Sequence, residues 1–214
     1  MQKFLIPLAA LAVVALAFSV ATADHHEKHE KDKKAGHDHA AKLGEAAPSF
    51  SLQDQTGKTH TLSDYAGKVV VLEWFNNDCP YVVKHYSGGA MNATAKKYAD
   101  KDVVWLAINT TSGKSSDDNK AIAADWKIDR PILSDSTTEV AKAYQSKATP
   151  TMYIIDKEGK LVYWGAIDSD NSPDAKKIEG ATNYVAKALD EVLAGKPVSE
   201  PKTKPYGCGV KYKS

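Results

Sequence analysis

The sequence contains a continuous apolar run, Val69–Leu72, which directly follows Gly67-Lys68. A short run of this kind, in which polar and apolar residues do not alternate, is typical of a strand buried on both faces of a sheet. Such a strand needs a covering layer on each side, and this requirement leaves few architectures open. The run therefore predicts a sheet in the interior of the molecule.

Strand and helix patterns alternate along the rest of the chain. Further strands are expected at Val103–Ile108, Pro131–Leu133, Thr151–Ile155 and Leu161–Trp164, and the last two are joined by a tight turn at Glu158-Gly159. Helices are expected from Pro80 to about Tyr98 with an interruption at Gly88-Gly89, and at Lys120–Trp126, Val140–Tyr144 and Asn183–Leu193. This order indicates an α/β fold, with a central mixed β-sheet flanked by helices on both faces.

The first segment, residues 1–23, has the features of a signal peptide. Lys3 supplies a positive charge, an apolar stretch follows from Phe4 to about Phe18, and Ala21-Thr22-Ala23 is a small-x-small cleavage site. The apolar stretch is shorter than the ~20 residues that a membrane span needs, which favours cleavage over an uncleaved anchor. The expected product is an exported protein of the periplasm, the cell envelope or the exterior, without membrane association after cleavage.

Residues 24–43 are predicted to form a disordered, His-rich linker. Acidic and lysine residues balance there, and Leu43 is the one large apolar side chain, so the segment cannot bury enough surface to order itself. One interpretation is a solvated spacer between the signal and the domain. The alternative is a loose metal site made by the histidines of this segment, which are His25, His26, His29, His37 and His39.

Residues 44–194 carry the globular pattern and are predicted to form one domain, followed by an extended tail at residues 195–214. The 28 basic and 27 acidic residues give a formal charge of +1, which excludes a basic surface for nucleic acid. The two cysteines, Cys79 and Cys208, can form at most one intrachain bridge. A disulfide scaffold is therefore excluded as well.

Cys79 is the residue with the clearest chemical potential. It stands between the end of the buried strand and Pro80, a residue that suits the first position of a helix. Free N–H groups and the positive end of the helix dipole favour a thiolate at such a place. The thiolate is the nucleophile in disulfide exchange and in peroxide reduction alike. The alternative is a buried, inert cysteine.

Several motifs resemble the redoxin branch of the thioredoxin superfamily, which includes the alkyl hydroperoxide reductase/thiol-specific antioxidant proteins. The motifs are Gly44-x-x-Ala47-Pro48-x-Phe50-x-Leu52, Leu62-Ser63-Asp64-Tyr65-x-Gly67-Lys68 and Cys79-Pro80. The resemblance spans about residues 44–194 and implies a thioredoxin-like fold. Thr149-Pro150-Thr151 resembles the cis-proline segment of that superfamily, which lies beside the active cysteine. The end of the chain, Gly207-Cys208-Gly209-Val210-Lys211, resembles the tail of exported, peroxiredoxin-like proteins.

The chain also departs from the family pattern. Val82 stands where thioredoxin has its second cysteine, so a local two-cysteine cycle is excluded. Asn76 replaces the threonine of typical peroxiredoxins, and Pro150 falls at the place of their site arginine. Arg130 precedes a different strand and is expected to make a surface or structural ion pair. The groups that polarise a peroxide are thus missing from their usual positions.

The resemblance implies roles for the residues around Cys79. Cys208 is the candidate resolving cysteine, and the alternative is a static bridge that pins the tail. Glu73 has the spacing of thioredoxin's buried carboxylate and is a candidate general base; its alternative is an ion pair with a lysine. Asn76, Pro80, Thr149 and Pro150 are expected to shape the substrate site. The helical spacing turns His85 away from Cys79, towards the surface.

The predicted function is that of an exported thiol-dependent oxidoreductase with peroxiredoxin-like antioxidant activity. Cys79 attacks a peroxide or a disulfide, Cys208 resolves the product, and an external thiol, either a thioredoxin-like protein or a small molecule, reduces the pair. No cofactor is expected. The alternatives are a thiol–disulfide reductase without peroxidase activity, a metal-binding or metal-delivery protein that uses the His-rich arm, and an inert module locked by one bridge.

Overall fold

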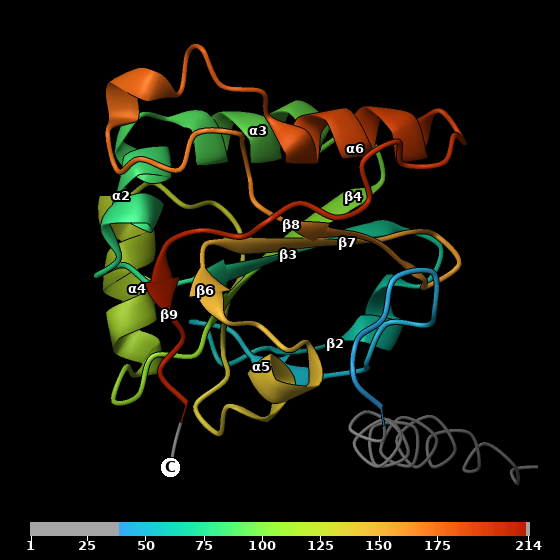
Figure 1. Cartoon of the computed structure of the whole chain (residues 1–214). Helices are drawn as coiled ribbons and strands as arrows, with labels where there is room; N and C mark the ends of the chain where they lie inside the picture. Colours follow the sequence, from blue (N-terminus) through green and yellow to red (C-terminus); the bar gives the residue numbers. More distant parts are fainter. Residues whose placement is uncertain (1–38, 213–214) are drawn as a thin grey trace, which may run out of the picture.

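The computed structural model describes residues 39–212. These residues form a seven-stranded sheet in the order β2-β1-β5-β4-β3-β7-β8, with helices on both faces (Figure 1). The predicted signal peptide and most of the predicted His-rich linker lie outside the described residues. Within residues 39–212, no helix is long and apolar enough to cross a membrane.

Strand β3 (Val69–Phe75) lies inside the sheet, and all of its residues are buried. It runs parallel to β4 (Val103–Asn109) and antiparallel to β7 (Thr151–Ile155). Its residues alternate between two apolar layers, because Val69, Val71 and Phe75 contact one layer and Val70, Leu72 and Trp74 the other. The continuous apolar run is therefore explained by burial on both faces, as predicted.

The outer strands complete a mixed sheet. Strand β5 (Ile132–Ser134) pairs parallel with β4, and the hairpin of β1 (Ser51–Gln53) and β2 (Thr59–Thr61) lies beyond it. Strand β8 (Leu161–Gly165) pairs antiparallel with β7 and is the last strand on the other side. Strands β3, β4, β5, β7 and β8 overlap the predicted ones, because their apolar runs mark the buried segments, whereas the short strands β1 and β2 are not among the predicted strands.

The helices are α2 (Pro80–Ser87), α3 (Ala90–Tyr98), α4 (Ser116–Asp125), α5 (Glu139–Ala143) and α6 (Tyr184–Leu193), with short 3-10 turns η1 (Leu62–Tyr65) and η2 (Ala175–Lys177). The predicted interruption at Gly88-Gly89 separates α2 from α3, and Gly89 adopts φ +74°. Helix α4 begins earlier than predicted, because Ser115 and Asp118 form a capping box. In Figure 1, α3 and α6 lie above the sheet and α5 below it.

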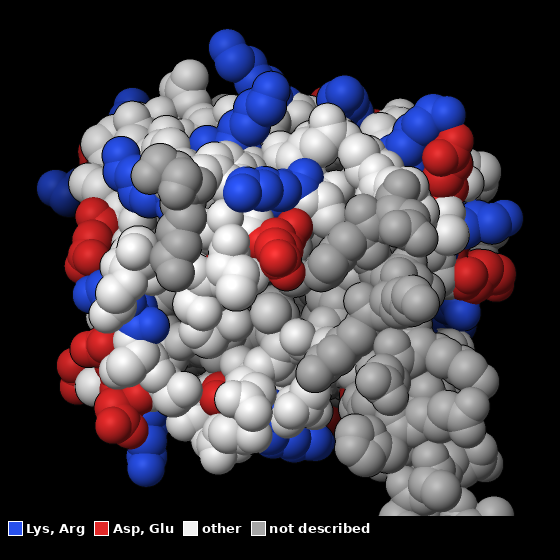
Figure 2. Space-filling view, turned by 90° about the horizontal axis from the view of Figure 1, so that it is seen from below, with Lys and Arg blue, Asp and Glu red and all other residues white. Residues whose placement is uncertain are grey.

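The two ends of the described chain both contact the domain. Ala41 is buried, and its N–H donates to the carbonyl oxygen of Ala143 at 2.8 Å. Ala41 and Leu43, which the sequence analysis places in the disordered linker, thus pack on the domain through their apolar side chains. The tail contains the two-residue strand β9 (Cys208–Gly209), which pairs with β6 (Ala148–Thr149). On the face seen in Figure 2, basic and acidic side chains of the described residues are interspersed.

Candidate active site

Cys79 caps the N-terminus of α2, directly after the turn that follows β3. The residue is fully buried and has extended backbone angles, and Pro80 occupies the first helical turn. The turn is held by Asn76, whose side-chain oxygen accepts a hydrogen bond from the Asp78 N–H at 2.8 Å, while its carbonyl oxygen accepts from the Cys79 N–H at 3.1 Å. Cys79 is therefore the N-cap residue of α2, at the positive end of the helix dipole, where the sequence analysis places it.

The segment Thr149–Pro150 lies directly beside Cys79. The peptide bond between the two residues is cis, in agreement with the family resemblance. The Cys79 Sγ donates a hydrogen bond to the Thr149 carbonyl oxygen at 3.1 Å. The structure thus brings together Cys79, Pro80, Thr149 and Pro150, four of the predicted site residues.

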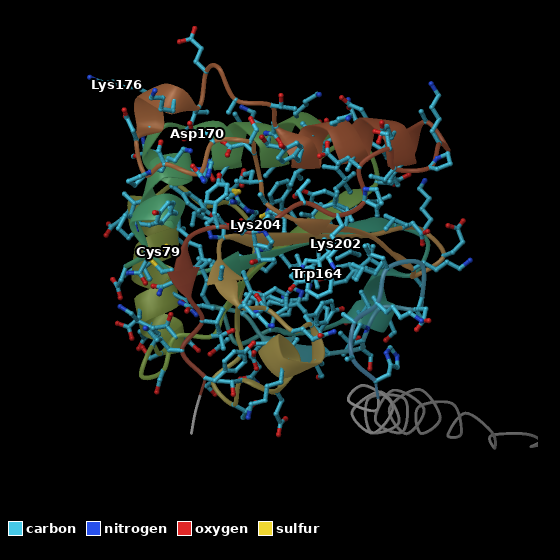
Figure 3. All side chains as sticks on the ribbon, in the orientation of Figure 1. Cys79, Trp164, Asp170, Lys176, Lys202 and Lys204 are labelled. Atoms are coloured by element: carbon cyan, nitrogen blue, oxygen red, sulfur yellow. The ribbon has the colours of Figure 1, made fainter. Side chains whose placement is uncertain are left out.

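The tail places Cys208 beside the Thr149–Pro150 segment, close to Cys79. Strand β9 pairs antiparallel with β6, so that Cys208 lies opposite Thr149. Figure 3 labels Cys79 next to this strand. Both cysteines are free thiols, and the Cys208 thiol is within hydrogen-bonding reach of Cys79. The pairing of Cys208 with Thr149, the residue whose carbonyl oxygen contacts the Cys79 thiol, thus makes the two cysteines candidates for one disulfide.

Gly207 allows the tail to approach this closely. Its φ is +121°, and a Cβ atom at this position would lie 2.0 Å from the Thr149 carbonyl oxygen. Since L-residues rarely adopt this conformation and no Cβ fits at that distance, the contact requires glycine. The glycine that precedes Cys208 is thus explained by packing against the cis-proline segment.

Upstream of Gly207, the tail runs along the edge of strand β8. The Trp164 N–H donates to the Pro201 carbonyl oxygen at 2.9 Å, and the Thr203 N–H donates to the Trp164 carbonyl oxygen at 3.2 Å. The Lys202 ammonium lies 4.9 Å from the Trp164 ring centroid, and both side chains are labelled in Figure 3. Residues 201–203 of the tail are therefore docked on the edge of the sheet.

The two thiols differ in acidity. Burial by itself raises the pKa of Cys79, but hydrogen bonds from Cys208 and Thr149 and from backbone N–H groups outweigh it, and the pKa of Cys79 lies below its ordinary value of 9.0. Burial raises the pKa of Cys208 to about 11, together with the hydrogen bond to Cys79 and the negative charge of the Cys79 thiolate. Cys79 is consequently the thiol that ionises first and the stronger candidate for a nucleophile.

Glu73 lies buried on β3, within a network of polar side chains. Its carboxylate accepts hydrogen bonds from the Tyr86 hydroxyl at 2.8 Å and from the Trp105 indole N–H at 2.9 Å. The Arg130 guanidinium lies 3.4 Å from the same carboxylate and donates to Asn92 at 2.9 Å. The partner of Glu73 is thus an arginine, not the lysine considered above, and Arg130 makes a buried structural ion pair.

The expected surface position of His85 is wrong. The helical spacing does turn it away from Cys79, but the tail and the segment after β8 cover that side of α2, and His85 is fully buried. Its Nε2 lies 3.0 Å from the Tyr206 hydroxyl, and its Nδ1 lies 3.9 Å from Asp168. The sequence analysis also did not single out Lys84, which is fully buried beside it. In the sequence, Lys84 and His85 stand between apolar residues of α2. This pattern is the signal from which their burial could have been predicted.

The alternative that the protein binds or delivers a metal finds no candidate ligand cluster within the described residues. Residues 39–212 contain no group of three or more His, Cys, Asp or Glu side chains that could hold a metal ion. His60 is paired with Asp54 at 2.8 Å, and His39 lies exposed at the start of the described chain. The other four histidines of the His-rich arm lie outside the described residues.

Comparisons with known proteins agree with the site. The model of the AhpC/TSA family matches residues 43–164. The chain is 32% identical over 122 residues to the thiol-disulfide oxidoreductase ResA of Geobacillus thermodenitrificans, covering 57% of this chain and 68% of that protein. It is 31% identical over 130 residues to the chloroplastic peroxiredoxin Q of Populus jackii, covering 56% and 59%.

The fold has close counterparts among solved structures. A hypothetical protein of Sinorhizobium meliloti 1021 matches with a TM-score of 0.71 at 28% identity, over 82% of this chain and 97% of that one. The family match, the cis-proline segment and the cysteine at the start of α2 all lead to one assignment. The chain belongs to the AhpC/TSA family and is a thiol-dependent oxidoreductase with a thioredoxin-like fold.

Proposed function

We propose that the protein reduces disulfide bonds with two thiols, Cys79 as the nucleophile and Cys208 as the resolving thiol. The observation that carries this proposal is the pairing of β9 with β6, which brings the Cys208 thiol within hydrogen-bonding reach of Cys79. A static bridge would also use this geometry. The lowered pKa of Cys79 supports exchange, because the thiolate is the reactive form.

The reaction has two steps. In the first, the Cys79 thiolate attacks one sulfur of a substrate disulfide, the substrate S–S bond breaks, and one half leaves as a thiolate. In the second, Cys208 loses its proton and attacks the Cys79 sulfur of the mixed disulfide. The second half of the substrate then leaves as a thiolate, and the Cys79–Cys208 disulfide remains. The substrate gains two electrons, and an external thiol donor restores the pair.

The acidities support this order of events. The charge and the hydrogen bond of the Cys79 thiolate are among the causes that raise the pKa of Cys208. Once Cys79 is part of a mixed disulfide, its charge is gone and those two causes disappear. The pKa of Cys208 then falls, which prepares it for the second step. Lys211 lowers the pKa of Cys208 as well.

Peroxide reduction is the second candidate, favoured by the similarity to peroxiredoxin Q. Here the Cys79 thiolate would attack one peroxide oxygen and become a sulfenic acid, while the O–O bond breaks and the other oxygen leaves as hydroxide or alkoxide and takes up a proton. The Cys208 thiol would then condense with it and release water. The geometry supports this candidate less, because Asn76 bonds within its own turn and Arg130 is held by Glu73 and Asn92. Neither side chain is thereby directed at a peroxide on Cys79.

One experiment separates the two candidates. The fully reduced protein is mixed with one equivalent of a peptide disulfide or of hydrogen peroxide, quenched by alkylation over seconds to minutes, and mapped at Cys79 and Cys208. We expect the peptide disulfide to form the Cys79–Cys208 bridge faster, and the Cys208→Ser variant to stop at a mixed disulfide on Cys79. Faster bridging with peroxide would favour the peroxidase. Thiols that stay reduced with both reagents would refute the two-thiol cycle.

We also propose that the protein acts outside the cytoplasm, because residues 1–23 have the features of a signal peptide. An oxidising compartment would keep the pair oxidised unless a thiol donor, either a thioredoxin-like protein or a small thiol, reduces it. N-terminal sequencing of the protein recovered from its native host tests this assignment. A chain that begins at Asp24 supports export, and a chain that retains residues 1–23 contradicts the predicted cleavage.

A further inference from the structure

Helix α2 buries two ionisable side chains on the side opposite Cys79. Lys84 and His85 are 1% and 0% exposed. The Lys84 ammonium donates to the Asp170 carbonyl oxygen at 2.7 Å and to its carboxylate at 3.0 Å, and it lies 3.9 Å from the Asp168 carboxylate. Burying charges is costly unless they are paired, so this cluster calls for an explanation beyond packing.

The side chain that reaches this cluster from the tail is Tyr206. Its hydroxyl donates to the Asp168 carboxylate and lies 3.0 Å from His85 Nε2. The Lys84 ammonium lies 5.6 Å from the Tyr206 ring centroid. We call Lys84, His85 and Asp168 the latch.

The hydrogen-bond pattern assigns the proton on His85. Because the Tyr206 hydroxyl gives its hydrogen to Asp168, the bond from His85 requires a hydrogen on Nε2. His85 Nδ1 is buried without a hydrogen-bond partner within residues 39–212, which fits an unprotonated nitrogen. The chain of donors therefore runs from His85 through Tyr206 to Asp168, and it fixes the tyrosine hydroxyl from two sides.

The hydrogen bonds of Tyr206 also restrain Cys208, because the two residues are close in the chain. Tyr206 precedes Cys208 by two residues, and only Gly207 separates them. The strand pairing of Cys208 itself spans two residues, which is too short to hold a chain end without further contacts. We propose that the latch makes Tyr206 a positioning residue, which keeps Cys208 against Cys79.

This role rests on the proposed two-thiol function and concerns its second step. Resolution of the mixed disulfide is intramolecular, so its rate follows the effective concentration of Cys208 at Cys79. Removing the Tyr206 hydroxyl takes away a hydrogen bond to a charged acceptor, and such bonds are among the strong ones in proteins. We expect an effective concentration about tenfold lower. The first step, attack by Cys79, involves Cys208 only through its hydrogen bond to the Cys79 thiolate. Its rate per Cys79 thiolate is therefore expected to stay unchanged.

The test compares Tyr206→Phe with Tyr184→Phe in the full chain. Tyr184 and Tyr206 both line a cavity of about 640 Å³ beside the latch, so the control makes the same substitution in a second tyrosine of that cavity. Each reduced protein is mixed with a peptide disulfide, and the mixed disulfide on Cys79 and the Cys79–Cys208 bridge are followed separately by alkylation and mass spectrometry. The equilibrium of the bridge with glutathione gives the effective concentration.

The expected result is a split between the two steps. Tyr206→Phe should form the mixed disulfide at the wild-type rate per Cys79 thiolate and resolve it about tenfold more slowly. At equilibrium with glutathione, its Cys79–Cys208 bridge should be about tenfold less favoured. Tyr184→Phe should behave as wild type in both steps. If both variants resolve the mixed disulfide at the same rate, the positioning role of Tyr206 is overturned and the two-thiol function stays intact. A wild-type protein that never forms the bridge overturns the function, and the positioning role with it. Asp168→Asn, which removes the acceptor charge, should shift resolution in the same direction.

Discussion

Replacing Gly207 with alanine should separate the tail from β6 while the domain stays folded. A Cβ at residue 207 would lie 2.0 Å from the Thr149 carbonyl oxygen and 2.9 Å from its carbonyl carbon. Both atoms belong to the backbone of a paired strand and cannot swing aside like the end of a side chain. The φ of +121° at this residue adds strain of about 1–3 kcal/mol for any L-residue.

The strand pairing that opposes this separation is no stronger than the strain at residue 207. The pairing of β9 with β6 spans two residue pairs, and each backbone hydrogen bond contributes about 0.5–1.5 kcal/mol net. The strain energy at residue 207 is thus about equal to the free energy of the strand pairing. The steric overlap with the Thr149 carbonyl group adds to this strain. We therefore expect β9 to leave β6 and Cys208 to leave Cys79, so that the bridge forms at least about tenfold more slowly.

Gly209→Ala is the matched control for this prediction. The nearest atom to a Cβ at residue 209 is the Lys147 carbonyl oxygen at 3.9 Å, which is an ordinary contact. Both variants are reduced, mixed with one equivalent of peptide disulfide, quenched with acid and analysed for the Cys79–Cys208 bridge, and thermal unfolding checks that the domain is folded. If Gly207→Ala forms the bridge as fast as Gly209→Ala, the argument from close packing is refuted.

Substitutions at Glu73, Cys208 and His85 test the interactions of these side chains. Glu73→Gln leaves the Arg130 guanidinium without its carboxylate, and we expect the free energy of unfolding in urea to fall by about 3 kcal/mol; a loss of bridging rate at unchanged stability would instead support the predicted proton-transfer role of Glu73. Cys208→Ala removes a hydrogen bond that favours the Cys79 thiolate, so the midpoint of Cys79 alkylation against pH should rise, and an unchanged midpoint would contradict the coupling of the two thiols. Burial lowers the pKa of His85 from 6.5 to about 4. Because the unfolded chain binds this proton below pH 6.5 and the folded chain does not, the folded state should lose about 3 kcal/mol between pH 6.5 and 4, and His85→Gln should flatten that part of the urea-unfolding profile.

The sequence predicts the fold well because its determinants are local. The apolar run at Val69–Leu72 marks the central strand, and Pro80 and Gly88-Gly89 mark the start and the interruption of the helical segment after it. Each of these signals acts within a few residues. The order of strands and helices then follows from short connections and from the need to cover both faces of the sheet.

The arrangement of the site is less predictable, because its contacts join distant parts of the chain. The helical spacing of His85 correctly excludes contact with Cys79, but nothing near it in the sequence reveals that Tyr206 and Asp168 cover it. The ion pair of Glu73 with Arg130 likewise joins β3 to the connection before β5, a strand that is not its neighbour in the sheet. Resemblance to a family was needed to connect Cys208 with Cys79, since a two-residue strand has no recognisable pattern.

The docking of the tail along β8 also bears on the solubility of the protein. Strand β8 is the last strand of the sheet, and an uncovered strand edge offers unpaired N–H and C=O groups to the edges of other molecules. The hydrogen bonds of Trp164 with Pro201 and Thr203 occupy part of this edge, and Lys202 adds a charge there, a common protection against aggregation. Cleavage of the chain before residue 200 would therefore remove the second thiol and at the same time open a surface for self-association.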